Sequence, residues 1–230
     1  MTLGAVIAAG GKGERFGRPG GKQLAPLAGT TVVSHTVGVF DTLPGIDTIV
    51  VVADPDALEV FGDELEAFSR VRAIVPGGAT RQESVEAGVA ALGADVDVVV
   101  IHDGARPLVT APTVLSAIEA LDETIDGVAV GHPAYDTVKS VDADRLVIGT
   151  EDRSRLWLAQ TPQVFWRVVL HRAYAWAERT GFIGTDDASL VEHMGGRVRV
   201  VMGPRDNIKI TVAQDLAFAE AVLKARRGSS

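Results

Sequence analysis

Short runs of β-branched residues alternate along this chain with longer segments in which apolar residues recur at helical spacing. Residues 98–101 are apolar at every position, as expected for a strand that is buried on both faces of a sheet. The predicted strands are residues 4–8, 48–53, 71–75, 96–101 and 128–131. The predicted helices between them are residues 31–42, 56–69, 81–92 and 112–124. This alternation predicts an α/β fold with a single doubly wound, mostly parallel sheet and helices on both faces.

The regular alternation ends after Gly131. Two strands are predicted at residues 136–141 and 146–150, joined by the turn residues Asp142-Ala143-Asp144, which gives an inserted β-hairpin arm at about residues 134–152. Because an isolated two-stranded ribbon is only marginally stable in water, we expect the arm to pack either on its own domain or on a second subunit. Beyond the arm we expect helices at 164–179, at 185–194 and from 213 onward, a strand at 197–201 and a short segment at 207–211. No linker or repeat divides the sequence, so we expect residues 1–230 to form a single domain.

The composition excludes several classes of protein. The 230 residues include no cysteine, which rules out disulfides and thiolate catalysis and is typical of a reducing cytoplasm. The formal net charge of −8 argues against nucleic acid as the main partner. No apolar run approaches the roughly 20 residues of a membrane span, and the N-terminus lacks the pattern of a signal peptide. We therefore expect a cytoplasmic protein without nucleic-acid or membrane partners.

The segment after the first strand combines many glycines with positive charge. Six glycines and four basic residues, Lys12, Arg15, Arg18 and Lys22, lie between Ala9 and Gln23. Glycine lets backbone amides approach an anion closely, and fixed cations beside them suit a ligand with several phosphates. Open α/β sheets bind their ligands at the carboxyl ends of the strands, where this loop lies. The segment predicts a phosphate-binding loop.

Three kinds of phosphate loop fit this composition to different degrees. A P-loop is excluded because Phe16 and Gln23 stand where the motif needs Gly and Ser or Thr. A dinucleotide fingerprint is disfavoured because Asp54, the best candidate for the ribose-binding acid, lies about twice the usual 20 residues downstream. Nucleotidyl transfer needs fixed positive charge around two polyanions, which the loop supplies. From this segment alone, a flexible solvated loop with incidental charges remains an equal alternative.

Nine motifs spread over the chain decide between these alternatives. They are residues 8–17, 22–23, 77–84, 102–107, 136–139, 152–157, 161–163, 185–188 and 206–209. With these motifs in this order, the chain resembles the nucleotide-diphospho-sugar transferase superfamily, and within it the 2-C-methyl-D-erythritol 4-phosphate cytidylyltransferase family. The resemblance implies that CTP and 2-C-methyl-D-erythritol 4-phosphate react to give 4-diphosphocytidyl-2-C-methyl-D-erythritol and pyrophosphate. Mg²⁺ or another divalent cation would be held mainly by the CTP phosphates, near Asp103.

The resemblance also implies roles for individual residues. The nucleotide would contact Ala8, Ala9, Gly10, Gly11, Gly13, Gly77, Gly78, Ala79, Ser84 and Asp103. The polyol phosphate would contact Asp103, Thr137, Arg153, Thr161, Thr185 and Lys209. The catalytic residues would be Arg15, Lys22, Arg153 and Lys209. A homodimer is implied, in which the arm of one protomer brings Thr137 and Arg153 to the site of the other.

Local sequence supports some of these roles independently and leaves others open. Asp103 ends a central strand and should point into the ligand crevice, whereas His102 beside it is expected to be structural. The family often has an acid where Ala79 stands, and proline before the lysine where Gly20-Gly21 stand, so we expect that end of the loop to be mobile until CTP binds. Two alternatives remain: a cytidylyltransferase for another polyol phosphate such as ribitol 5-phosphate, and a CTP-binding module without catalysis.

Overall fold

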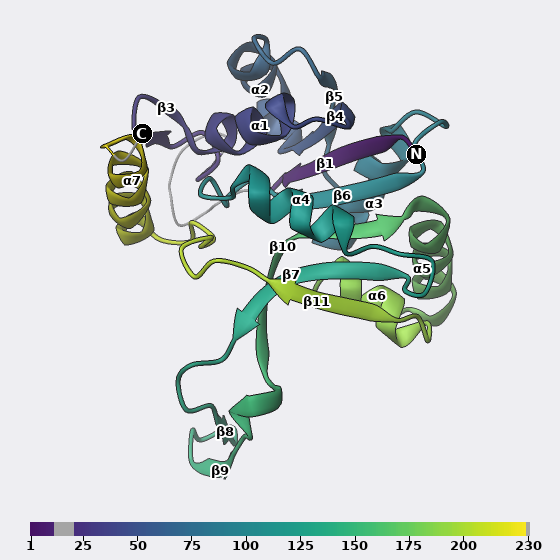
Figure 1. The fold of residues 1–230 in the computed structure, drawn as a ribbon, viewed down its shortest axis with the longest axis vertical. Coiled ribbons are helices and arrows are strands. Elements are labelled where there is room, and N and C mark those ends of the chain that lie inside the picture. Colours follow the sequence, from purple (N-terminus) through teal and green to yellow (C-terminus); the bar gives the residue numbers. More distant parts are fainter. Residues whose placement is uncertain (12–20, 229–230) are drawn as a thin grey trace.

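A seven-stranded sheet forms the centre of the molecule in the computed structural model, which describes residues 1–11 and 21–228. The strand order is β11-β7-β10-β6-β1-β4-β5 (Figure 1). The strands are β1 (Leu3–Ala9), β4 (Ile46–Ala53), β5 (Val71–Pro76), β6 (Val98–Asp103), β7 (Gly127–Pro133), β10 (Trp157–Trp166) and β11 (Val198–Met202). A separate small ribbon pairs β2 (Pro26–Leu27) with β3 (Thr30–Thr31). The strands predicted from the sequence are all present, so the α/β prediction is confirmed.

One central strand was not predicted. Residues 164–166, expected at the start of a helix, belong instead to β10, which runs antiparallel between β6 and β7. The other four pairings in the sheet are parallel. Val164 and Phe165 are completely buried, and an apolar pair followed by helical spacing fits either element equally well. The helix α5 (Arg167–Thr180) starts only after the strand ends.

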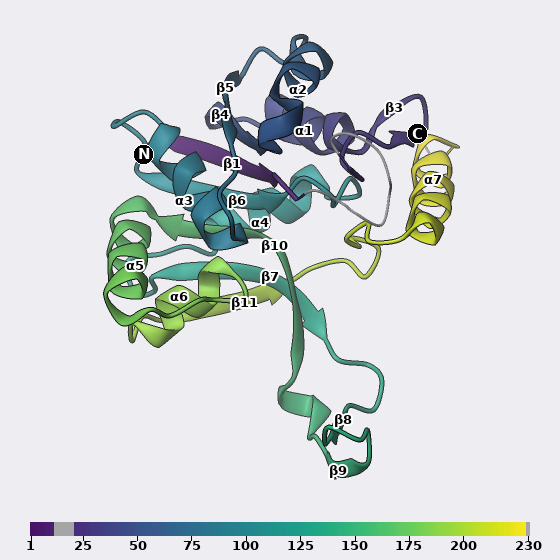
Figure 2. The same cartoon turned by 180° about the vertical axis from the view of Figure 1, so that it is seen from behind.

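Helices cover both faces of the sheet. One core cluster packs α1 (Val32–Thr42), α2 (Leu58–Leu65) and α4 (Ala111–Glu119) against it. A second cluster packs α3 (Arg81–Ala91), α5 and α6 (Asp187–His193) against the opposite face. Figures 1 and 2 show α4 in front of the sheet in the first view and α3 in front of it in the second. The predicted helices on both faces are therefore confirmed, although α2 and α4 are shorter than expected.

The end of β7 and the start of β10 continue out of the body of the molecule as an arm (Figures 1 and 2). At its tip, β8 (Lys139–Val141) pairs antiparallel with β9 (Val147–Thr150), and the Asp142 carboxylate accepts hydrogen bonds from two backbone amides of the turn. Both strands are shorter than predicted. A short 3₁₀ turn, η3 (Arg153–Arg155), leads back to β10.

The C-terminal helix α7 (Ala213–Gly228) packs beside the β2–β3 ribbon, where a third apolar cluster includes Leu27, Ile210 and Ala219. This helix covers the segment that follows the opening loop, and Figure 1 shows it at the edge of the molecule away from the arm. Within residues 1–11 and 21–228, we find no helix with the length and apolar character needed to cross a bilayer.

Candidate active site

Two adjoining cavities open at the carboxyl ends of the parallel strands. The first, of about 390 Å³, lies beside the ends of β1, β5 and β6. Among the described residues, its walls are Ala8, Gly10, Gly11, Lys22, Gln23, Pro55, Gly78, Ala79, Thr80, Arg81, Ser84, Asp103, Ala105 and Lys209. This is the position at which open α/β sheets bind ligands.

Close backbone packing shapes one wall of this first cavity. The amide of Gly77 donates to the carbonyl of Ala53 at 2.8 Å. A Cβ atom on Gly78 would lie 2.5 Å from Cβ of Glu83, so only glycine fits there without a shift of the helix. The sequence of this loop thus fixes how closely the first turn of α3 approaches the end of the sheet.

Side chains of the first turn of α3 cap this helix and bind the loop before it. Thr80 accepts a hydrogen bond from the amide of Glu83 at 3.1 Å. The Glu83 carboxylate reaches back to the amide of Ala79, at 2.8 Å, instead of the amide of the cap residue. The Ser84 hydroxyl accepts from the amide of Gly78 and donates to the carbonyl of Thr80. These bonds hold the segment from Gly78 to Thr80 in one conformation against the cavity.

The second cavity, of about 240 Å³, shares a wall with the first. Arg81, Asp103 and Lys209 line both cavities. The other described walls of the second cavity are Arg106, Ala159, Gln160, Thr161, Gln163, Thr185 and Asp186. Ligands bound in the two cavities would therefore both contact these three charged side chains.

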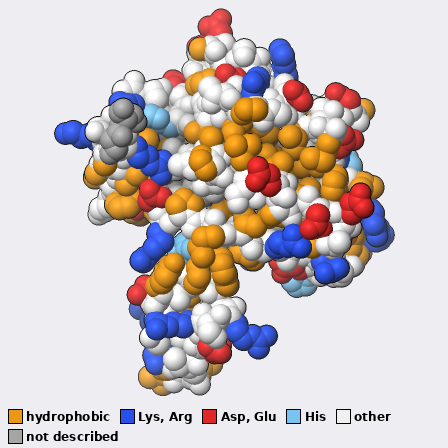
Figure 3. Space-filling model, in the orientation of Figure 1, with side chains coloured by type: hydrophobic (Ala, Val, Ile, Leu, Met, Phe, Trp, Pro, Cys, Tyr) orange, Lys and Arg blue, Asp and Glu red, His pale blue; other side chains and the backbone are white. Residues whose placement is uncertain are grey.

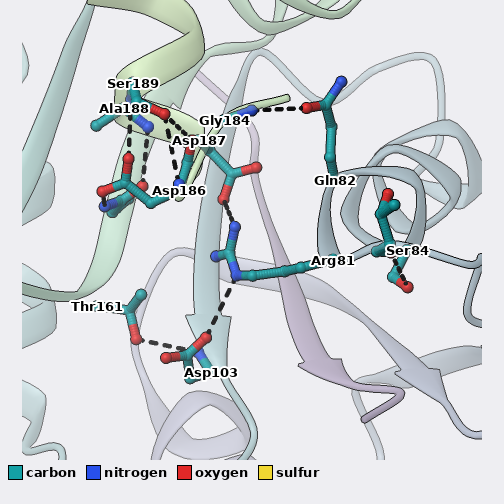
Figure 4. A network of polar contacts seen from close by, with 12 residues as sticks. Arg81, Gln82, Ser84, Asp103, Thr161, Gly184, Asp186, Asp187, Ala188 and Ser189 are labelled. Carbon is teal, nitrogen blue, oxygen red and sulfur yellow. Dashed lines mark hydrogen bonds and ion pairs between the residues drawn. The ribbon is translucent and has the colours of Figure 1, made fainter. Parts of the chain in front are cut away.

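Asp103 of this shared wall is paired with three cations, and Figure 4 shows its contacts with Arg81 and Thr161. Lys209 Nζ is 3.0 Å from Oδ2 of the carboxylate, Arg106 Nε is 3.2 Å from the same oxygen, and Arg81 Nε is 3.7 Å from Oδ1. Burial would raise the pKa of Asp103, but Lys209, Arg81 and Arg106 together outweigh it and hold this pKa well below its usual range. Asp103 is therefore ionised at neutral pH, and three cations surround it.

A chain of hydrogen bonds behind Asp103 determines the protonation of His102. The carbonyl of Arg106 can only accept, so Nε2 of His102, 3.3 Å away, carries the ring proton. Nδ1 then accepts from the hydroxyl of Thr161 at 3.1 Å, and that hydroxyl accepts from the amide of Asp103 at 3.0 Å. Burial lowers the pKa of His102 to about 4. His102 is a neutral structural residue, as the sequence indicates.

Comparisons with known proteins agree over almost the whole chain. A family model described as 2-C-methyl-D-erythritol 4-phosphate cytidylyltransferase matches residues 3–225. The chain belongs to this family. Curated relatives that carry the same name include one from Geotalea uraniireducens, 42% identical over 98% of both chains. Another, from Symbiobacterium thermophilum, is 43% identical over 97% of this chain and 94% of its own.

Solved structures support the same assignment. The 4-diphosphocytidyl-2C-methyl-D-erythritol synthase of Anaerococcus prevotii has a TM-score of 0.86 and 31% identity, covering 97% of this chain and 98% of its own. The 2-C-methyl-D-erythritol 4-phosphate cytidylyltransferase of Thermus thermophilus has a TM-score of 0.80 and 30% identity, covering 97% and 100%. The predicted family, and with it a nucleotidyltransferase of the non-mevalonate isoprenoid pathway, is confirmed.

Most residues that the sequence assigns to this cytidylyltransferase site lie at the two cavities. The first cavity brings together Ala8, Gly10, Gly11, Lys22, Gly78, Ala79, Ser84, Asp103 and Lys209. The second adds Thr161 and Thr185. Ala9 is buried and Gly77 supports the loop through its bond to Ala53, so neither lines a cavity. Gly13, Arg15 and Gly20 lie outside the described residues, and the mobility expected for Gly20-Gly21 stays a prediction.

Two predicted residues are not brought to the cavities of their own chain. Thr137 and Arg153 are exposed on the arm, and neither contributes to the described walls. Arg153 donates instead to the carbonyl of Tyr135, which fixes the return of the arm. Their role in the active site of a second protomer stays a prediction.

Several polar wall residues were given no role from the sequence. They include Gln23, Arg81, Gln160, Gln163 and Asp186. Arg81 and Gln163 lie within matched motifs, residues 77–84 and 161–163, and Arg81 also follows a glycine loop at a helix start. A basic residue in that position was the one signal that could have singled it out.

The described residues contain no cluster of three or more acidic or histidine side chains suited to a metal ion. Asp103 is the single carboxylate in the described walls of the first cavity. Mg²⁺ in nucleotide sites is commonly held by substrate phosphates with one or two carboxylates. A metal that arrives with a triphosphate would fit this donor set, and Asp103 would be the described wall residue able to contact it.

Proposed function

We propose that the first cavity binds CTP, that the second binds 2-C-methyl-D-erythritol 4-phosphate, and that cytidylyl transfer occurs at their shared wall. The observation that carries this assignment is that Arg81, Asp103 and Lys209 line both cavities. The glycine-rich wall at Gly78 and Ala79 presents backbone groups, which suit the edge of a cytosine base. The second cavity is lined by hydroxyl, amide and charged side chains, which suit a polyol phosphate.

The reaction requires little acid–base chemistry. An oxygen of the acceptor phosphate forms a bond to the α-phosphorus of CTP, and the bond from that phosphorus to the pyrophosphate leaving group breaks. The acceptor phosphate is already ionised at neutral pH, so no general base is required. The chain's task is to align two polyanions and to stabilise the negative charge that develops.

Fixed cations around the cavities perform that task. Lys22 and Lys209 line the first cavity, and Arg106 lines the second. Arg15 and Lys22 are our candidates for stabilising the transition state, with Lys209 orienting the acceptor. A divalent cation bound with CTP would neutralise part of the triphosphate charge, with Asp103 as its protein ligand. Since CTP belongs to the cytoplasmic nucleotide pool, we also infer a cytoplasmic location.

The arm supports a homodimer as part of the same proposal. Leu146, Val147 and Ile148 at its tip are between 60% and 70% exposed. Hydrophobic side chains also gather at the root of the arm (Figure 3), where Tyr135, Trp157 and Leu158 are exposed. Apolar surface of this extent on a narrow arm is typical of a protein–protein contact. A second protomer covering the arm would receive Thr137 and Arg153 beside its second cavity.

A pyrophosphate-release assay that crosses four nucleoside triphosphates with several polyol phosphates tests the proposed function. We expect rapid release only for CTP with 2-C-methyl-D-erythritol 4-phosphate. Equal or faster release with ribitol 5-phosphate would identify a different acceptor. CTP binding without release with any acceptor would identify a binding module and contradict the proposal.

A further inference from the structure

The first turn of α3 contacts both the shared wall and a loop on the far side of the second cavity (Figure 4). Arg81 Nη1 lies 2.8 Å from Oδ2 of Asp187, while its Nε lies 3.7 Å from Oδ1 of Asp103. The neighbouring Gln82 accepts a hydrogen bond from the amide of Gly184 at 3.1 Å. Two consecutive residues of one helix therefore hold the loop from Gly184 to Asp187.

The loop between these two contacts forms a wall of the second cavity. Thr185 and Asp186 line that cavity. Asp186 also caps α6 by accepting from the amide of Ser189, and it accepts a hydrogen bond from Gln163. Any shift of the loop relative to α3 would therefore move side chains that the acceptor meets.

The carboxylate of the ion pair at the base of this contact is well protected from water, whereas the Arg81 side chain is 29% exposed. The Asp187 side chain is 1% exposed, and its second oxygen accepts from the hydroxyl of Tyr174 at 2.9 Å. Burial opposes the charge of Arg81, but the carboxylates of Asp187 and Asp103 outweigh it and raise the Arg81 pKa. The partly exposed guanidinium of Arg81 forms ion pairs with two carboxylates, and its planar group offers donors in fixed directions, so it links the two acids.

The loop that precedes Arg81 is held independently. Gly78 and Ala79, which line the first cavity, are fixed by Ser84 and Glu83 on the same helix. Neither bond involves Arg81 or Gln82. The wall on the nucleotide side should therefore keep its shape when the link to the loop at Gly184–Asp187 is weakened.

We propose that Arg81 and Gln82 are positioning residues that fix the acceptor pocket relative to the nucleotide pocket. Through Asp187 and Gly184 they set where Thr185 and Asp186 stand, and through Asp103 Arg81 orients the carboxylate that both pockets share. This inference rests on the proposed assignment of the two cavities. It predicts that weakening the link impairs acceptor binding much more than CTP binding, a separation that a merely structural ion pair would not produce.

Steady-state pyrophosphate release tests the proposal, with CTP and 2-C-methyl-D-erythritol 4-phosphate each varied while the other is saturating. The variants are Arg81→Lys, which keeps charge but loses the planar group, and Gln82→Ala, which removes a single hydrogen bond. Gln82→Glu keeps an oxygen that can accept from Gly184. Arg199→Lys alters an exposed ion pair with Asp122, 2.9 Å long and outside both cavities, and is the matched control.

We expect the acceptor KM to rise about fivefold or more in Arg81→Lys and Gln82→Ala. The CTP KM should stay within about twofold of wild type in Gln82→Ala, since Gln82 lines neither cavity, and should rise less than the acceptor KM in Arg81→Lys, since Arg81 lines both cavities. Gln82→Glu and Arg199→Lys should retain both wild-type KM values. The proposal is overturned if the acceptor KM of either folded variant stays within about twofold of wild type, or if both KM values rise equally. If Arg81→Lys does not fold, the comparison of Gln82→Ala with Gln82→Glu decides alone. A wild-type protein that releases no pyrophosphate would instead contradict the proposed function.

Discussion

At the scale of single residues, His102 shows how a buried side chain supports the site without reacting. It is completely buried, and both ring nitrogens are engaged, one by Thr161 and one by the carbonyl of Arg106. The Thr161 hydroxyl also holds the backbone of Asp103. Protonation of His102 would put a second donor opposite that hydroxyl and a charge in the core, which explains why burial lowers its pKa to about 4.

This lowered pKa predicts a pH-dependent loss of stability. The ordinary pKa of histidine is 6.5, so His102 of the unfolded chain becomes protonated as the pH falls below this value. In the folded protein His102 stays neutral until about pH 4. The free energy of unfolding should therefore fall by about 2 kcal/mol between roughly pH 7 and pH 5 through this residue. His102→Asn, with an amide oxygen to accept from Thr161, should lack this component.

Urea unfolding curves at several pH values measure the effect. The matched control is His171→Asn, because His171 is exposed on α5. The free energy of unfolding of the His171→Asn variant should change with pH as that of the wild type does. If the free energy of unfolding depends on pH identically in wild type and His102→Asn, burial does not lower the pKa of His102 in the folded protein.

The sequence predicted residues whose position follows from one strand or one loop. Asp103 was predicted because an acid at the carboxyl end of a central strand must face the crevice. Arg81 was not assigned a role because its buried partner Asp187 comes from α6, where Tyr174 of α5 donates a hydrogen bond to Asp187. No local pattern states that these helices meet the start of α3. Long-range pairing of this kind becomes visible only in the folded chain.

At the scale of elements, the regular strand–helix alternation and the hairpin that interrupts it were predictable, whereas the strand β10 was not. The parallel strands β1, β4, β5 and β6 are short apolar runs with helices between them, which determines their type. The strand β10 follows the arm directly and continues into α5 without a turn residue between them. Its apolar end therefore has the same pattern as the first turn of a helix.

The arm predicts a property of the assembled protein. Sedimentation velocity at micromolar concentration should show a dimer, because the apolar tip at Leu146, Val147 and Ile148 would otherwise remain in water. Replacing Val147 and Ile148 by serine should shift the protein toward monomer and lower activity, since Thr137 and Arg153 would no longer reach a second site. Val168→Ser, at an apolar residue 65% exposed on α5, is the control. A wild-type monomer with full activity would contradict the shared site.

At the scale of the whole molecule, the topology explains why two substrates can meet. The parallel half of the sheet, β6-β1-β4-β5, ends at the first cavity, whereas β10 enters antiparallel and brings Gln160, Thr161 and Gln163 to the second. The change from parallel to antiparallel occurs beside Asp103, at the end of β6. The family resemblance predicted Thr161, Thr185 and Lys209 as acceptor residues, but the way they come together beside Asp103 depends on this unpredicted strand.

We predict that CTP and the acceptor occupy separate cavities that meet at Arg81, Asp103 and Lys209. A crystal structure with a non-hydrolysable CTP analogue and 2-C-methyl-D-erythritol 4-phosphate tests it most directly. We predict the cytosine beside Gly78 and Ala79, the polyol beside Thr161 and Thr185, and the acceptor phosphate in line with the α-phosphorus at the shared wall. An acceptor bound elsewhere, or a nucleotide base in the second cavity, would contradict it.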